Sequence, residues 1–318
     1  MAYGALAVKE AGFAGMMVNR IGRRIALALA ALAGASAASA QPAAPRPAIW
    51  VIEDSDTRIY LFGTVHVFPA ALRWRSAALN RIIAEAGELV METPEAGADE
   101  IDPARLTRPM QLGKSVPILE RVSSAAREPL RQALAATGVP IATYDAMTTW
   151  GVAFMLVGLQ MRAASGNADT PPADAPSLGR TSGAEDVLGG LFRKAGKPIS
   201  GVETVDEQIR FFSSLPLDAQ RRFLESIVLG TDAGQVDAPD QSWVRGDVDG
   251  IAAEMRTMPP EIYRTLLTAR NRVWTDWLVR RMARPGAILF AVGAGHLAGP
   301  DSVQSMLAGR GVRARRID

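Results

Sequence analysis

Two short turns hold both histidines of this 318-residue chain. The first turn, Gly63-Thr64-Val65-His66, follows the apolar run Tyr60–Phe62, and the second, Gly293-Ala294-Gly295-His296, follows Leu289–Val292. An apolar run closed by glycine is typical of a buried strand that ends in a turn. The sequence therefore predicts that each histidine stands just past the carboxyl end of a strand.

This position suits metal chemistry. Ligands of open α/β sheets bind beyond the carboxyl ends of the strands, and glycine lets the backbone turn closely beside them. We therefore predict that His66 and His296 face one site and supply imidazoles to a metal ion. A single such histidine is more often an ordinary turn or core residue, because short motifs match by chance. Two matching copies that contain every histidine of the chain favour the functional interpretation.

Two imidazoles do not complete a hydrolytic metal site, which usually has about three protein ligands and a water molecule. Glu92 and Glu203 each follow a predicted strand, as the histidines do. One of them could ligate the metal while the other acts as general base on water. The alternatives are a solvated carboxylate at a loop start for Glu92 and a helix N-terminal residue for Glu203. The sequence does not separate the two roles.

One arginine could serve a substrate. Arg270 lies in the predicted helix 259–284 and could orient a substrate carboxylate or stabilise an oxyanion. The same helix carries five further arginines, so the alternative is that Arg270 belongs to a solvated face.

The remaining pattern predicts an α/β fold with a central mixed sheet and flanking helices. Residues 165–183 are rich in Pro, Ala and Asp, which predicts a flexible loop between an N-terminal half (41–164) and a C-terminal half (184–318). Each half contains strand, turn with histidine, helix and strand, so we interpret the halves as distantly related. Strands are predicted at 48–53, 58–62, 88–92, 198–202, 289–293 and 312–317, and helices at 72–86, 186–195, 204–215, 217–229, 259–284 and 300–308, with a largely helical stretch at 102–164. The apolar segment 147–161 is predicted to be a buried helix, because it is short for a membrane span.

Composition limits the function further. With 48% apolar and 21% charged residues the chain is globular, and the absence of cysteine excludes disulfides and thiolate ligands. Residues 1–40 have the arginines, apolar segment and Ala38-Ser39-Ala40 site of a signal peptide, which predicts cleavage near Ala40 and export to the periplasm. Its removal takes four of the 35 basic and one of the 33 acidic residues, leaving 31 and 32. Nothing in this balance favours nucleic acid.

Four segments together resemble the TraB/GumN family, which includes the animal Tiki proteins. They are Gly63–His66, Gly201–Gln208, Ala269–Trp274 and Val292–Gly299. The resemblance implies a fold similar to erythromycin-esterase and ChaN-like haem-binding proteins. It also implies a metal-dependent hydrolytic site with Mn or Co favoured and Zn as an alternative. In this chain that site would comprise His66, His296, Glu92, Glu203, Arg270 and Asn271.

We therefore predict an exported metal-dependent hydrolase that acts on peptide or amide bonds. Its expected partner is a peptide or small-molecule substrate, without nucleic acid and without a membrane anchor after signal cleavage. The alternative is a non-catalytic periplasmic binding protein for haem, a peptide signal or a metal, which would use the same cleft.

Overall fold

The computed structural model describes residues 45–66, 68, 72–94, 107–112, 115–164, 183–230 and 241–318. The predicted signal peptide 1–40 lies outside these residues, as does 165–182 of the predicted loop. No described helix is long and apolar enough to cross a membrane.

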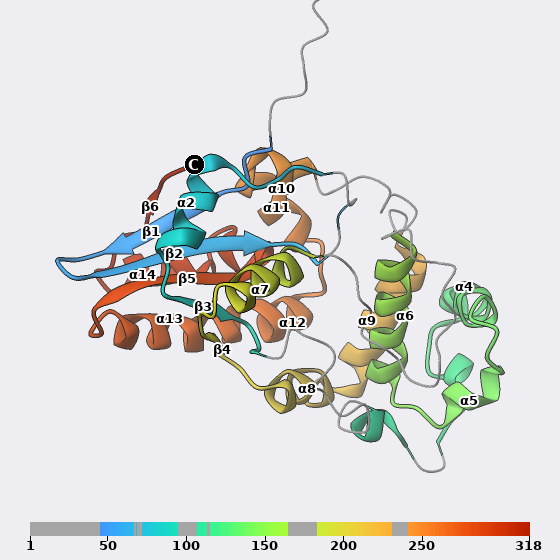
Figure 1. The fold of residues 1–318 in the computed structure, drawn as a ribbon. Helices are drawn as coiled ribbons and strands as arrows, with labels where there is room; N and C mark the ends of the chain where they lie inside the picture. The colour runs from blue at the N-terminus through green and yellow to red at the C-terminus, as the bar shows by residue number, and fades with distance from the viewer. Residues whose placement is uncertain are drawn as a thin grey trace, which may run out of the picture. The chain divides into compact units, whose positions relative to one another are not determined.

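One mixed sheet organises the described chain (Figure 1). Its six strands lie in the spatial order β4-β3-β5-β2-β1-β6. They are β1 (Ile49–Glu53), β2 (Thr57–Thr64), β3 (Glu88–Met91), β4 (Ile199–Gly201), β5 (Gly286–Gly293) and β6 (Arg315–Arg316). The four strands from β4 to β2 are parallel, and β1 and β6 add antiparallel pairs at one edge. The predicted α/β class with a central mixed sheet is confirmed.

The hairpin of β1 and β2 forms because two apolar runs flank a polar turn. Ile49 pairs with Phe62 and Glu53 with Arg58, and the Asp54 carboxylate accepts hydrogen bonds from the backbone of the turn. Most side chains of both strands are buried, which matches near-continuous apolar runs rather than alternation. Burying each Ile, Leu or Phe side chain contributes roughly 1.5–3 kcal/mol.

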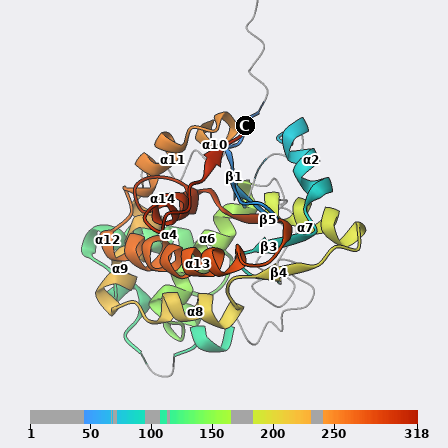
Figure 2. The ribbon, with the colours of Figure 1, turned by 90° about the vertical axis from the view of Figure 1, so that its left-hand side faces the viewer.

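Helices cover both faces of the sheet. Figure 2 shows α13 and α14 on one side of the strands and α2 and α7 on the other. The first face packs Trp274, Leu278 and Leu307 against strand residues such as Phe290. The helices of these layers are α2 (Ala77–Glu85), α7 (Ala184–Lys194), α10 (Gln241–Arg245), α11 (Val248–Met255), α13 (Ala269–Arg281) and α14 (Val303–Ala308). Because both faces are covered, the carboxyl edge of the parallel strands is where a ligand can approach.

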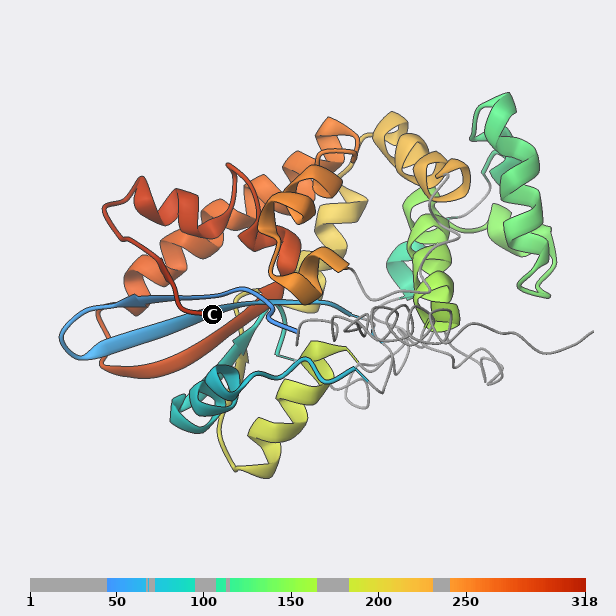
Figure 3. The same ribbon diagram turned by 90° about the horizontal axis from the view of Figure 1, so that it is seen from above.

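A group of helices with its own core lies toward that edge, to the right of the sheet in Figures 1 and 3. Helix α6 packs against α9, and Val152, Leu156 and Leu224 are buried between them. The predicted buried helix at 147–161 is thereby confirmed. The group contains α4 (Ser124–Ala135), α5 (Ile141–Asp145), α6 (Thr149–Ala164) and α9 (Leu217–Leu229), with 3-10 turns η1 (Arg108–Met110) and η2 (Ile118–Glu120) nearby in sequence.

Several boundaries differ from the sequence prediction. Helix α2 begins at Ala77 rather than at residue 72, because the Ser76 side chain caps it by accepting a hydrogen bond from the Leu79 amide. The predicted final strand 312–317 shrinks to β6. The apolar spacing of the segment 259–284 predicts one broad buried face that contains Ile262, Leu266, Leu267, Val273, Trp274, Trp277 and Leu278. Val273 is 60% exposed, so its assignment to that face was wrong.

The predicted long helix is also not uniform. It consists of α12 (Pro260–Tyr263), a π-helical turn η3 (Arg264–Thr268) and α13. The π turn inserts a residue and rotates the helical segment after it, which is why a single periodicity misplaced Val273. Helix α8 (Val205–Ser213) and the 3-10 turn η4 (Ala294–Leu297) complete the described elements.

Candidate active site

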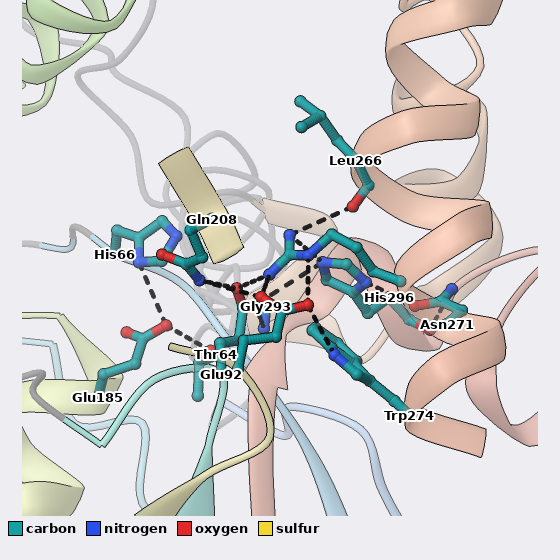
Figure 4. A network of polar contacts seen from close by, with 12 residues as sticks. Thr64, His66, Glu92, Glu185, Gln208, Leu266, Asn271, Trp274, Gly293 and His296 are labelled. Carbon is teal, nitrogen blue, oxygen red and sulfur yellow. Dashed lines mark hydrogen bonds and ion pairs between the residues drawn. The ribbon is translucent and has the colours of Figure 1, made fainter. Parts of the chain in front are cut away.

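The four parallel strands deliver the predicted residues to one edge in spatial order. Glu203 follows β4, Glu92 follows β3, His296 follows β5 and His66 follows β2, as Figure 4 shows for the last three. Strands β2 and β5 are in register, with Thr64 opposite Gly293. Adjacent strands lie about 4.8 Å apart, so residues that follow neighbouring strand ends can meet. The two histidine turns therefore share one edge although 230 positions separate them.

Glycine at position 63 lets the two turns approach. A Cβ atom built on Gly63 would lie 3.0 Å from Cα of Ala294, which is backbone and cannot move aside cheaply. The Gly63 carbonyl also accepts a hydrogen bond from the indole of Trp243 at 2.8 Å. The first glycine of the motif is thus explained by close packing of β2 against η4.

The His296 imidazole is buried and its partners determine its tautomer. Asn271 uses its side-chain nitrogen to donate to the carbonyls of His296, at 3.3 Å, and Asp301, at 2.7 Å. Its oxygen therefore faces Nδ1 of His296 at 2.6 Å and must accept that proton. Nε2 is left unprotonated and accepts from Nη1 of Arg270 at 3.2 Å. Burial lowers the pKa of His296 to about 3, so the ring is neutral at physiological pH.

Glu92 faces this ring. Its Oε1 atom lies 3.7 Å from Nε2 of His296 and accepts a hydrogen bond from the Gly293 amide at 2.8 Å. Its Oε2 atom accepts from Nη2 of Arg270 at 2.6 Å. Burial by itself would raise the pKa of Glu92, but the positive charge of Arg270, with smaller effects of His66 and the Gly293 amide, holds it at about 2. The Glu92 carboxylate is therefore ionised.

Glu203 and Arg270 form a buried pair. Oε1 of Glu203 accepts from Nε of Arg270 at 2.9 Å and from the indole of Trp274 at 2.8 Å, and Oε2 accepts from Nη2 at 2.7 Å. The guanidinium also lies over the rings of Trp274, 4.8 Å from the centroid, and Phe211, at 5.5 Å. Burial opposes the charge of Arg270, but Glu92 and Glu203 raise its pKa above the usual value. Both oxygens of Glu203 are thus occupied by protein donors.

The π turn contains one more partner of Arg270. Nη1 donates to the carbonyl of Leu266 at 3.2 Å, in addition to Nε2 of His296. The turn is defined by the Ala269 amide, which bonds to the carbonyl of Arg264 five residues back instead of four. Such π turns are frequent at functional sites.

His66 approaches from the opposite side of Glu92 (Figure 4). Its Nδ1 atom lies 3.2 Å from Oε1 of Glu185, and that oxygen also accepts from the hydroxyl of Thr64 at 2.5 Å. The His66 side chain is 56% exposed, whereas Glu185 is 15% exposed. The negative charge of the Glu185 carboxylate raises the pKa of His66 to about 9. His66 therefore carries a proton at neutral pH. Its contact with Glu185 uses Nδ1, so its Nε2 atom is not part of that pair.

The donor set is chemically suited to a divalent ion, which favours imidazole and carboxylate ligands. The separation of 3.7 Å between Nε2 of His296 and Oε1 of Glu92 is close to the roughly 3.4 Å that separates two ligands of one tetrahedral ion. The described residues do not bring three or more His, Asp or Glu side chains together around a single ion position. His296 and Glu92 are therefore the pair whose spacing fits a metal ion. The carboxylate of Glu203 instead binds Arg270 and Trp274.

Three residues of this site were not predicted from the sequence. Glu185 lies in the first turn of α7, beside the predicted loop, where an acidic residue is common for its favourable interaction with the helix dipole. Gln208 lies within the segment that carried the family resemblance, and its Nε2 atom is 3.4 Å from both Glu92 and Glu203. Trp274 has the pattern of a core residue and is one, but its indole also binds Glu203. The sequence offers one indication of this second role: a tryptophan predicted to be buried needs a hydrogen-bond acceptor for its indole N–H.

Comparison with known families gives one match. The sequence model described as TraB/PrgY/gumN family matches residues 48–316. The corresponding comparisons with curated proteins and with solved structures give no match.

Proposed function

This chain belongs to the TraB/PrgY/gumN family, and we propose that the site at the carboxyl edge of its sheet is a metal-dependent hydrolytic centre. The reaction we propose is hydrolysis of a peptide or amide bond. The metal is expected to be Mn²⁺ or Co²⁺, with Zn²⁺ as the alternative, since all three accept imidazole and carboxylate ligands.

One observation carries the proposal: the neutral imidazole of His296 and the ionised carboxylate of Glu92 lie at ligand-pair spacing on the carboxyl edge of the sheet. Each of these two ligand side chains is oriented by a hydrogen bond from a second residue. Asn271 fixes Nδ1 of His296, and the Gly293 amide fixes Oε1 of Glu92. Such outer partners orient metal ligands and are a regular feature of metal sites. His296 and Glu92 would hold the ion, which would polarise the scissile carbonyl and lower the pKa of water.

His66 and Glu185 would move the protons. A metal ligand must give up its proton, whereas His66 is paired with a carboxylate that keeps it protonated at neutral pH. An exposed, protonated imidazole fits a general acid that protonates the leaving amine through Nε2. Glu185 and Thr64 would then serve as positioning residues for His66. The proposal thus gives His66 a proton-transfer role in place of the ligand role expected from the sequence.

Arg270, Glu203 and Asn271 receive supporting roles. Every N–H direction of Arg270 already has a protein acceptor, so it positions Glu92 and Glu203 rather than offering free donors to a substrate. Glu203 anchors Arg270, and we do not assign it the ligand or base role predicted from sequence. Asn271 sets the tautomer of His296.

Export and substrate class rest on the sequence. The signal-peptide pattern of residues 1–40 supports a periplasmic location, and the resemblance to Tiki-type proteins supports peptide or amide substrates. Amino-terminal sequencing of the mature protein from a periplasmic fraction tests the first, with a start at Gln41 expected.

The central experiment separates metal ligand from proton carrier. Protein purified without a histidine tag is chelated, reloaded with Mn²⁺, Co²⁺ or Zn²⁺, and assayed for metal content and for cleavage of a fluorogenic peptide library. We compare the wild type with His296→Ala and His66→Ala. Because the chain has two histidines, each variant leaves a single imidazole to account for.

We expect His296→Ala to lose both metal and turnover, and His66→Ala to keep the metal but lose about 10²–10⁴-fold in turnover, the usual contribution of a general acid. Loss of metal in both variants would return His66 to the ligand role. Metal binding by the wild type without turnover on any peptide would instead favour the binding protein. Absence of metal binding in the wild type would refute the metal-dependent proposal.

A further inference from the structure

We propose that Arg270 is a resident cation that occupies the metal donors, so that a divalent ion binds only when two of the arginine's hydrogen bonds are given up. This inference rests on the proposed metal site and specifies how its occupancy is controlled. The consequence is that the protein binds metal more weakly than its ligands alone would allow, and that Arg270 sets the threshold.

The geometry of the guanidinium carries the inference. Nη1 of Arg270 lies 3.2 Å from Nε2 of His296. The lone pair of this nitrogen is the one that would hold a metal. Nη2 lies 2.6 Å from Oε2 of Glu92, the second donor. The arginine therefore contacts the same imidazole and carboxylate that would hold a metal. A cation and a divalent ion on one pair of donors also repel each other at close range.

Glu203 can keep Arg270 paired if the guanidinium moves. Glu203 holds the Nε and Nη2 atoms of Arg270 through a two-point contact of 2.9 and 2.7 Å, and this contact does not involve the metal donors. A shift of the guanidinium together with the Glu203 carboxylate would break the bonds to His296 and Glu92 while the buried charge stays paired, which avoids the large penalty of an isolated buried ion.

This scheme also accounts for the position of Glu203. It is buried and comes after a strand end as Glu92 does, yet both of its oxygens point to Arg270 and Trp274. A second carboxylate in this position is needed if the arginine is to leave Glu92 without losing its counterion.

The test is metal affinity, measured without any assay of turnover. Wild type, Arg270→Gln and the double variant Arg270→Gln/Glu203→Gln are titrated with Mn²⁺ and Co²⁺ by calorimetry, and the visible absorption of bound Co²⁺ reports its ligands. The double variant removes the anchor's charge together with the arginine, so that Glu203 is not left as an unpaired buried carboxylate. Arg272→Gln, at an exposed position on the same helix, is the matched control.

We expect Arg270→Gln to bind about ten- to a hundredfold more tightly than the wild type, the equivalent of one or two charge-assisted hydrogen bonds. The double variant should show a gain in the same direction, and Arg272→Gln should bind like the wild type. Circular dichroism confirms that each variant is folded, and structural damage would weaken binding rather than strengthen it.

The outcomes separate the two proposals. If the wild type binds metal and both Arg270 variants bind it equally well or more weakly, the proposed role of Arg270 is wrong. The proposed metal site is not affected by that result. Metal binding by the Arg270 variants but not by the wild type supports the role of Arg270 and refutes the metal-dependent function of the wild type. Absence of binding in every protein refutes the metal site and this inference with it.

Discussion

The tautomer of His296 is the most direct test of the site, because metal binding and the role of Arg270 both require a neutral ring with an unprotonated Nε2. Asn271 enforces this state through three contacts: Nδ1 of His296 at 2.6 Å and the carbonyls of His296 and Asp301 at 3.3 and 2.7 Å. The perturbation we choose is Asn271→Ala, which removes all three from a residue that is 1% exposed.

The expected cost is set by these contacts. A buried donor or acceptor left without a partner costs about 1–3 kcal/mol, and the longest of the three bonds contributes least. We therefore expect the free energy of unfolding to fall by about 3 kcal/mol, measured by urea denaturation. Metal affinity should fall by about 10–100-fold, the usual effect of losing an outer partner of a metal ligand.

The assay of the tautomer is long-range ¹⁵N–¹H NMR of the histidine rings. With two histidines in the chain, His66→Ala assigns the signals of His296 directly. The wild type should show His296 as the Nδ1-protonated, uncharged form from pH 5 to pH 8, since its pKa is lowered to about 3. In Asn271→Ala the fixed tautomer should be lost while the His66 signals stay unchanged. An Nε2-protonated or charged His296 in the wild type would refute our account of the site.

Three further outcomes are expected from neighbouring contacts. Glu185→Gln should lower the pKa of His66 from about 9 toward 6.5 in an NMR titration, because the carboxylate that holds the proton is gone; an unchanged pKa would disprove the pairing. The pKa of His66 is raised in the folded state, so its contribution to stability is complete below pH 6.5 and is lost as the pH rises through about 9. Solvent screens this exposed pair, so urea denaturation should show a loss of no more than about 1 kcal/mol, absent in His66→Ala. Finally, Gly63→Ala should destabilise the protein by about 1–3 kcal/mol in the same measurement, since its Cβ would meet the backbone of Ala294; a neutral effect would show that η4 can shift.

Helix boundaries show where sequence periodicity stops being informative. The segment 259–284 has the spacing of one amphipathic helix, yet the π turn η3 rotates its second part and leaves Val273 exposed. The inserted residue has no distinct composition, so a search for a repeat of 3.6 residues passes over it. The contact between the Leu266 carbonyl of this turn and Arg270 is visible only when the arginine side chain is placed.

The interpretation of two related halves stays a prediction, and the halves do not form separate sheets. Strand β5 of the C-terminal half lies between β3 and β2 of the N-terminal half. This insertion is what brings the second histidine turn beside the first. Sequence patterns predict that each histidine follows a strand. They do not determine which other strands pair with that strand in the sheet.

The sequence alone determined which residues stand at strand ends. Apolar runs closed by glycine, followed by His66 and His296, and short strands followed by Glu92 and Glu203, are local patterns set by backbone preference and burial. The tertiary structure decided how these ends are used. Glu92 faces the neutral imidazole of His296 whereas Glu203 binds Arg270, and the difference arises from partners 67 to 201 positions away in the chain. Side-chain partners so distant depend on strand order and helix rotation, which no local pattern encodes.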